Sequence, residues 1–134
     1  ANKNSIDLMM TIYKIQHIIF KSEAYTSVTN GDIKEDMISA NHHNCKFGDW
    51  YENIAPEIFA NNTTFTKMSQ PHKAFHEAVS QNIVFVKEGI GSLQKNKDTI
   101  IKNFAIAEAT SQELFTLMDQ LVQETAGDVD LEKI

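Results

Sequence analysis

Two histidines one helical turn apart are the strongest chemical signal in this sequence. His72 and His76 are spaced i and i+4, which in a helix places both imidazoles on one face, about 40° apart in azimuth. Imidazole nitrogens bind zinc, copper, nickel or iron, so the pair could hold one metal ion. A thiolate from Cys45 would favour zinc, and His17 could complete a tetrahedral shell of three histidines and one cysteine.

Each of these residues also has a structural interpretation. A core-facing histidine such as His17 can be a hydrogen-bonded interior residue, and a single cysteine such as Cys45 often packs as a small apolar side chain. His42 and His43 lie close to Cys45 and could chelate a metal locally. Adjacent histidines in an asparagine-rich segment are also typical of a solvated surface or of residues that position a loop.

Other metal and hydrolytic chemistries do not fit the sequence. A zincin motif needs Glu directly after the first histidine, but Lys73 follows His72 and Glu77 follows the second histidine, His76. A di-iron bundle needs an acidic residue three positions before each histidine, and neither has one. There is no nucleophile elbow and no glycine-rich phosphate loop. We therefore expect a protein that is not an enzyme.

Periodic apolar residues predict the long helices that would position these candidates. From residue 5 to about residue 26, apolar residues recur at three- and four-residue steps, and His17 lies within their stripe. The members of this stripe are Ile6, Met10, Tyr13, Phe20 and Ala24. A turn is predicted at residues 29–32, where the sequence reads TNGD.

Two further long helices are predicted in the second half of the chain. The first has Ser69 as its cap and Pro71 in its first turn. Its seam steps by four and three through His72, His76, Val79, Ile83, Val86 and Ile90. The second begins at an Asn96 or Asp98 cap. Its stripe is Ile101, Phe104, Ala107, Leu114, Met118 and Leu121.

The region between the long helices predicts only short helices. One covers residues 45–53 and carries the cysteine, and another covers residues 56–59 with Pro56 in its first turn. Strand signals are nearly absent. The sequence therefore predicts an all-α, up-and-down four-helix bundle, with the short segments completing the fourth side.

Composition restricts the class of protein further. The 134 residues predict one domain, residues 1–134, without repeats or linkers. A net charge of −6, with lysine as every basic residue, disfavours binding to nucleic acid. No apolar run approaches the roughly 20 residues that span a bilayer, so we expect no membrane contact. A lone cysteine suits the reducing cytoplasm, and an N-terminus without Met or a signal pattern suggests a domain cut from a longer protein.

Several sequence blocks resemble one known family. Residues 45–51, CKFGDWY, are similar to the C-x-[L/F]-G-x-W-[Y/L] signature of the bacterial chemoreceptor zinc-binding domain, CZB, and the preceding residues 41–44, NHHN, are common there. The family also has an upstream histidine followed three positions later by an aromatic residue, matched by HIIF at 17–20. A downstream HxxxH is matched within PHKAFH at 71–76. The blocks occur in the family's order.

The resemblance implies a site, a setting and a function. Its zinc ligands would be His17, Cys45, His72 and His76. It implies a cytoplasmic bundle, often a homodimer, attached to a chemotaxis transducer or a diguanylate cyclase. Such domains are thought to sense zinc, or oxidants such as hypochlorous acid, through the zinc-bound cysteine. The remaining alternative is a purely structural zinc bundle that dimerises its parent protein and carries no signal.

Physical chemistry makes both kinds of sensing reasonable. Metal binding would stabilise the fold and order the segment that brings Cys45 to the helices. A thiolate held by zinc is the form of cysteine that oxidants convert to sulfenic acid, which makes Cys45 the expected redox-reactive residue. Phe47, Trp50 and Tyr51 are predicted to anchor its segment in the core, and Gly48 to allow a close approach of the backbone.

Overall fold

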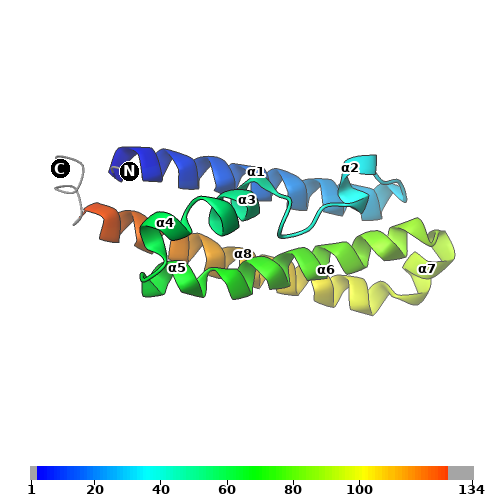
Figure 1. Cartoon of the computed structure of the whole chain (residues 1–134). Helices are drawn as coiled ribbons and strands as arrows, with labels where there is room; N and C mark the ends of the chain where they lie inside the picture. Colours follow the sequence, from blue (N-terminus) through cyan, green and yellow to red (C-terminus); the bar gives the residue numbers. More distant parts are fainter. Residues whose placement is uncertain (1–2, 127–134) are drawn as a thin grey trace.

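The computed structural model describes residues 3–126, and within them every regular element is a helix (Figure 1). The ends of the expected domain, residues 1–2 and 127–134, lie outside the described residues. The long helices are α1 (Lys3–Asn30), α6 (Ser69–Lys87) and α8 (Lys97–Ala126). Helix α1 packs against both α6 and α8, and α6 packs against α8. The prediction of an all-α bundle is confirmed.

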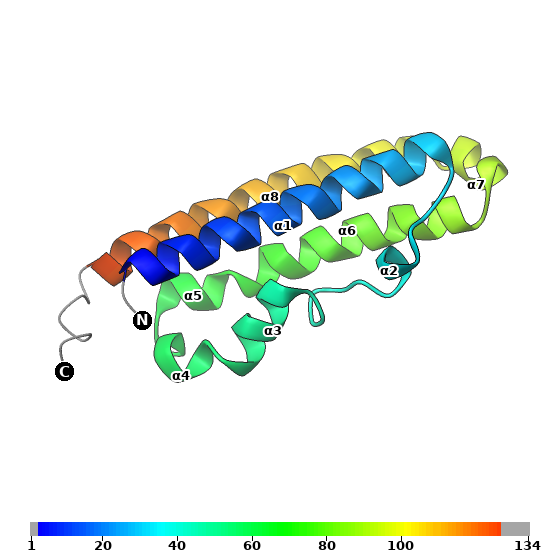
Figure 2. The ribbon, with the colours of Figure 1, turned by 90° about the horizontal axis from the view of Figure 1, so that it is seen from above.

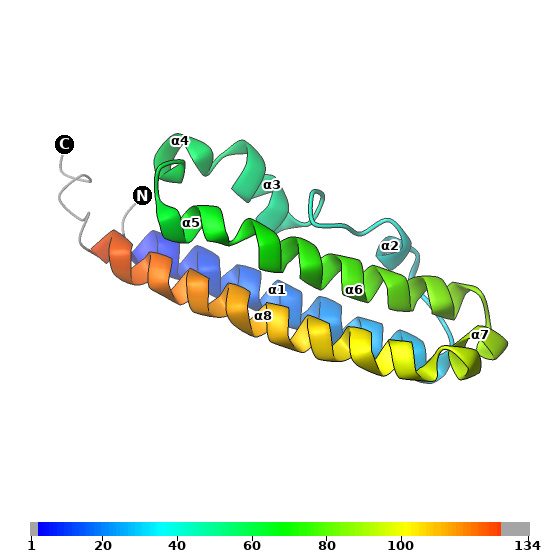
Figure 3. The same cartoon turned by 90° about the horizontal axis from the view of Figure 1, so that it is seen from below.

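Short helices form the fourth side of this bundle. They are α2 (Glu35–Ile38), α3 (Lys46–Asn53), α4 (Pro56–Phe59) and α5 (Thr63–Lys67), and α7 (Ile90–Lys95) connects α6 to α8. The chain runs along α1, returns through the short helices, runs along α6 and comes back along α8 (Figure 2). Helices α3 and α4 lie on the side of the bundle away from α8 (Figures 2 and 3). This path places the cysteine segment alongside α1 and α6.

The apolar core consists of two clusters. One surrounds α3 to α5 and includes Met10 of α1, and the other lies toward α2 and includes Ala24 of the same helix. His17 lies between these two residues on α1 and is also buried. The histidines therefore occupy a polar layer within the interior of the bundle.

The structure corrects the predicted end of the first helix. Helix α1 continues to Asn30, four residues beyond the expected end, so the predicted turn at 29–32 begins later. The chain leaves the helix at Gly31, whose φ of 69° suits a residue without a side chain. The turn-forming residues 29–32 still indicated where the chain changes direction, because residues of this kind also end helices.

The start and end of α6 also differ from the prediction. Ser69 is the first helical residue of α6 and does not cap it, because Met68 occupies the cap position. Helix α5, which the Asn62 side chain caps, ends directly before Met68. At the other end α6 stops at Lys87, and Gly89, with φ 103°, reorients the chain. Ile90, expected in the seam, is consequently 75% exposed. The prediction for Ile90 is wrong because the helical phase is interrupted before it.

In the last helix the sequence predicted the wrong one of two adjacent isoleucines to face the core. Helix α8 begins at Lys97, directly after Asn96, and Ile100 faces the core while Ile101 is 60% exposed. Both isoleucines satisfy a three- or four-residue step to Phe104, so periodicity does not separate them. Packing against α6 selects Ile100.

Candidate metal centre

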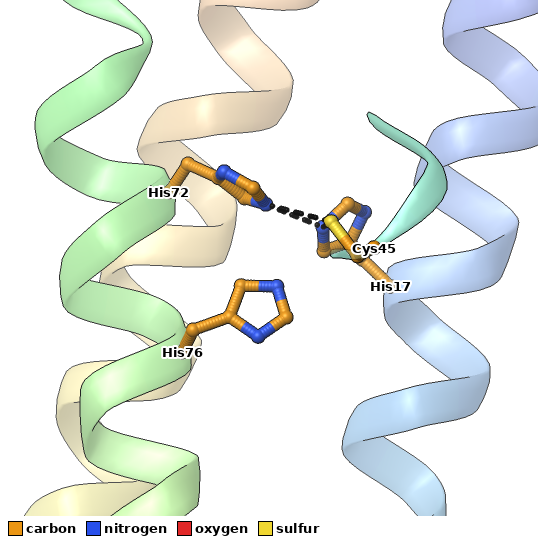
Figure 4. Close-up of side chains that lie close together, drawn as sticks. All are labelled: His17, Cys45, His72 and His76. Atoms are coloured by element: carbon orange, nitrogen blue, oxygen red, sulfur yellow. Dashed lines mark hydrogen bonds between the residues drawn. The ribbon is translucent and has the colours of Figure 1, made fainter. Parts of the chain in front are cut away.

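Four side chains from three separate segments of the chain converge in the interior of the bundle (Figure 4). His17 comes from α1, His72 and His76 from α6, and Cys45 from the residue that caps α3. The three imidazoles are buried and the cysteine is partly buried. One donor atom from each residue lies within 4.8 Å of the others. The structure thus brings together all four residues that the sequence singled out.

The separations among three of the donor atoms are close to those of a tetrahedral zinc site. Cys45 Sγ lies 3.2 Å from His72 Nε2 and 4.0 Å from His17 Nε2, and the two Nε2 atoms are 3.1 Å apart. Zinc bond lengths and tetrahedral angles place two nitrogens about 3.3 Å apart and a nitrogen and sulfur about 3.6 Å apart. These three donors need to move by only a few tenths of an ångström to share one ion, and the donor atom of His76 lies within 4.8 Å of each of them.

His76 has an unmet requirement for a partner. Both of its ring nitrogens are buried, and neither has a hydrogen-bond partner. A buried polar group without a partner costs about 1–3 kcal/mol, so such groups are uncommon in native structures. A metal ion bound by the cluster would satisfy one of these nitrogens. This observation supports a metal site independently of any family pattern.

A backbone contact fixes the orientation of the His17 imidazole. Its Nδ1 lies 2.7 Å from the carbonyl oxygen of Tyr13, one turn earlier in α1. A carbonyl only accepts, so Nδ1 carries the proton and donates it, and Nε2 keeps its lone pair facing the other donors. The helix backbone therefore sets both the tautomer and the direction of this imidazole.

Burial keeps the imidazoles neutral. It lowers the pKa of His72 to about 2 and that of His76 to about 3, and the neighbouring imidazoles contribute in the same direction. Burial also lowers the pKa of His17, although its bond to Tyr13 opposes the effect. Neutral imidazole is the form that binds metal, so at neutral pH these donors need not lose a proton first.

The cysteine is held in a different way. Burial raises the pKa of the Cys45 thiol, while the N–H of Gly48, which donates to Sγ over 3.3 Å, acts in the opposite direction. A cation at the cluster would favour the thiolate strongly. The thiol is therefore the donor whose charge depends most on whether metal is bound.

A compact turn presents Cys45 to the histidines, and sequence reasoning did not identify it. The side chain of Asn41 accepts from the backbone N–H groups of His43, at 2.8 Å, and Asn44, at 3.0 Å. The Asn44 side chain in turn donates to the carbonyl of Ser39 over 2.8 Å. The asparagines at 41 and 44 were the available signal, since Asn side chains commonly stabilise turns in this way.

Gly48 packs closely against the backbone of this turn. A Cβ atom added to it would lie 1.9 Å from the carbonyl oxygen of His42, which confirms the expected close approach of the backbone. Phe47 and Trp50 are buried in the core, as predicted. Tyr51 donates from its hydroxyl to the Phe65 carbonyl over 2.5 Å. The segment is consequently anchored on both sides of the cysteine.

A cavity of about 360 Å³ lies beside the cluster. Its lining includes His17, Cys45 and His76, together with residues of α2 and the loop after it, such as Asp36 and Ser39. Small molecules in this cavity would therefore lie next to three residues of the cluster.

The fold and the donor set together define a helical zinc-binding domain. The chain belongs to the CZB family: a family model described as the chemoreceptor zinc-binding domain matches residues 17–83, half of the chain and the part that contains all four residues. CZB is a regulatory domain and its cofactor is zinc. Neither the curated proteins nor the solved structures gave a match. Within residues 3–126, no helix combines the length and apolar character needed to cross a bilayer.

Proposed function

We propose that this domain is a zinc-dependent sensor within a bacterial cytoplasmic chemoreceptor or diguanylate cyclase, and that His17, Cys45, His72 and His76 bind its zinc ion. The observation that carries the proposal is the pair of buried, unpartnered nitrogens of His76 beside three further zinc-type donors. With four protein ligands the ion would have no open position for a catalytic water, which supports a regulatory role and not a hydrolytic one.

The four proposed ligands are presented by elements of unequal length. The histidines project from α1 and α6, which pack against each other and against α8. Cys45 projects from a turn and a helix of only eight residues, α3. Bonding of Cys45 to the metal would therefore hold a short segment against a rigid three-histidine base. Loss of that bond would release the segment, which is how the domain would report on its stimulus.

Oxidation is one such stimulus. When bound, zinc supplies a positive charge that keeps the Cys45 sulfur deprotonated. In the reaction with hypochlorous acid the thiolate sulfur forms a bond to chlorine, the O–Cl bond breaks, and hydroxide leaves with the electron pair. Water then displaces chloride from the sulfur, which forms the S–O bond and releases a proton. Sulfur loses two electrons and becomes a sulfenic acid. The partly buried sulfur at the wall of the cavity is accessible to an oxidant of this size.

Replacing Cys45 with serine tests the redox function. We expect hypochlorous acid to increase hydrogen exchange in residues 39–48 of the zinc-loaded wild type by at least about tenfold, since about 1.4 kcal/mol of lost protection has that effect. Cys45→Ser should show no such change. Met37→Leu, which removes an oxidisable sulfur of α2, is the control and should respond like wild type. An equal response in Cys45→Ser would locate the sensitivity elsewhere. Inert, permanently bound zinc would favour the structural alternative.

An exposed stripe on α1 supports a homodimer. Leu8, Ile12, Ile15 and Ile19 are spaced by four, three and four residues and are 43% to 62% exposed. That spacing forms the seam between two packed helices, and a single chain leaves it uncovered. The same stripe on a second copy would cover it across a two-fold axis.

Ile15→Lys is expected to dissociate such a dimer. A two-fold interface contains the substitution twice, so the dissociation constant should rise at least about 100-fold, as for a buried contact residue on each side. Ile58→Lys, at an equally exposed isoleucine of α4, is the matched control and should leave the dimer intact. Light scattering after gel filtration gives the masses. A wild type that stays monomeric at high micromolar concentration would contradict the proposal.

A further inference from the structure

A second group of metal-binding side chains lies outside the buried cluster. His42 and His43 occupy the turn before α3, and Glu52 lies on α3 nine residues after His43. One donor atom from each lies within 4.8 Å of the others. His43 Nδ1 and a Glu52 carboxylate oxygen are already 2.6 Å apart. Two imidazoles and a carboxylate form one of the donor sets that zinc uses in proteins.

The turn keeps this group in place before any metal arrives. The backbone N–H of His43 donates to the Asn41 side chain, and the carbonyl oxygen of His42 packs closely against Gly48. The rings of His42 and His43 lie against each other, with centroids 3.9 Å apart. Side-chain rotations at the surface would then bring the three donors around one ion.

The exposure of the histidines decreases toward the buried cluster. The side chain of His43 is 64% exposed, that of His42 is partly buried, and His72 is buried. The ring of His42 also approaches that of His72, with centroids 6.1 Å apart. His42 is therefore the member of the surface group whose ring approaches a ligand of the buried site.

From this arrangement we infer that His42, His43 and Glu52 form an exposed second zinc site, which supplies zinc to the buried cluster. The site has three protein donors, no thiolate and open access to water, so it binds zinc at least about 100-fold more weakly than the buried site and releases it readily. The supply role rests on the buried ligand set proposed above, whereas binding of the second ion does not.

The stoichiometry of zinc binding tests the second site. Protein that holds one zinc ion is titrated with further zinc and its metal content is measured after equilibrium dialysis. We expect wild type to rise from one to two zinc ions per chain, and His43→Ala and Glu52→Gln to stay at one. Glu57→Gln, an exposed acid of α4, is the matched control and should reach two. No second ion in wild type, or a second ion retained in both variants, would overturn the inference.

Loading kinetics test the supply role. Metal-free protein is mixed with Co²⁺, whose charge-transfer absorption with a thiolate reports arrival at Cys45 alone. We expect His43→Ala to reach the same final absorption at a rate at least about fivefold lower than wild type and Glu57→Gln. An unchanged rate would overturn the supply role. If the thiolate absorption never develops in wild type, the proposed ligand set of the buried site is wrong. The stoichiometry of zinc binding still tests the exposed site.

Discussion

His76→Leu is expected to have opposite effects on the zinc-free and the zinc-loaded domain. Without metal the substitution replaces two buried, unpartnered nitrogens with an apolar side chain of similar size, so the free energy of unfolding should rise by about 1–3 kcal/mol. With zinc present it removes one of the four proposed ligands. Loss of a direct ligand costs more than the 10- to 100-fold typical of supporting residues, so zinc affinity should fall at least about 100-fold.

Denaturant unfolding with and without a chelator, together with metal analysis, measures both effects. Glu77→Gln, an exposed residue next to His76 on α6, is the control and should leave both quantities unchanged. Cys45→Ala and His72→Ala should likewise lose stoichiometric zinc. A His76→Leu domain that is less stable without metal and still holds one zinc ion would show that His76 is a packing residue.

Gly48→Ala is expected to weaken zinc binding although Gly48 is not itself a proposed ligand. Its contact with the site is the backbone N–H that donates to Cys45 Sγ. Helix propensity alone predicts a gain of about 1 kcal/mol for this change within α3. The new Cβ atom would lie 1.9 Å from the His42 carbonyl oxygen and 2.9 Å from its carbon, and backbone atoms in a hydrogen-bonded turn cannot easily move aside. We therefore expect a loss of about 1–3 kcal/mol in stability and displacement of Cys45.

Gly91→Ala is the matched control. Gly91 also lies in a helix, α7, but a Cβ atom added there meets nothing within 4 Å. That variant should be as stable as wild type or up to about 1 kcal/mol more stable, with unchanged zinc affinity. Calorimetric titration with zinc and thermal unfolding of both variants provide the comparison. Equal zinc affinities for the two variants would show that the turn adapts without moving the cysteine.

Local periodicity accounts for what could be predicted from the sequence. The i, i+4 spacing of His72 and His76 and the stripe around His17 specify which faces of two helices carry imidazoles, because a helix repeats every 3.6 residues. The motif at 45–51 identified the cysteine segment and the family. These features need only neighbouring residues, and the structure and the family match bear out the all-α bundle, the short cysteine helix and the zinc cofactor.

Periodicity was insufficient where two neighbours fit equally well or where the chain changes direction. Ile100 and Ile101 both continue the stripe of α8, and contact with α6 decided between them. The spacing of Ile90 continues the seam of α6, but that helix ends at Lys87 and the positive φ of Gly89 redirects the chain before Ile90.

The sequence by itself determined the donor types, their helical faces and the family. Only the tertiary structure decided that Cys45 Sγ lies 3.2 Å from His72 Nε2, that His76 has no partner of its own, and that Glu52 meets His43 at the surface. The physical reason is that helical phase is a property of adjacent residues. The distance between segments far apart along the chain depends instead on how the helices pack and on the Asn41 turn that delivers the cysteine.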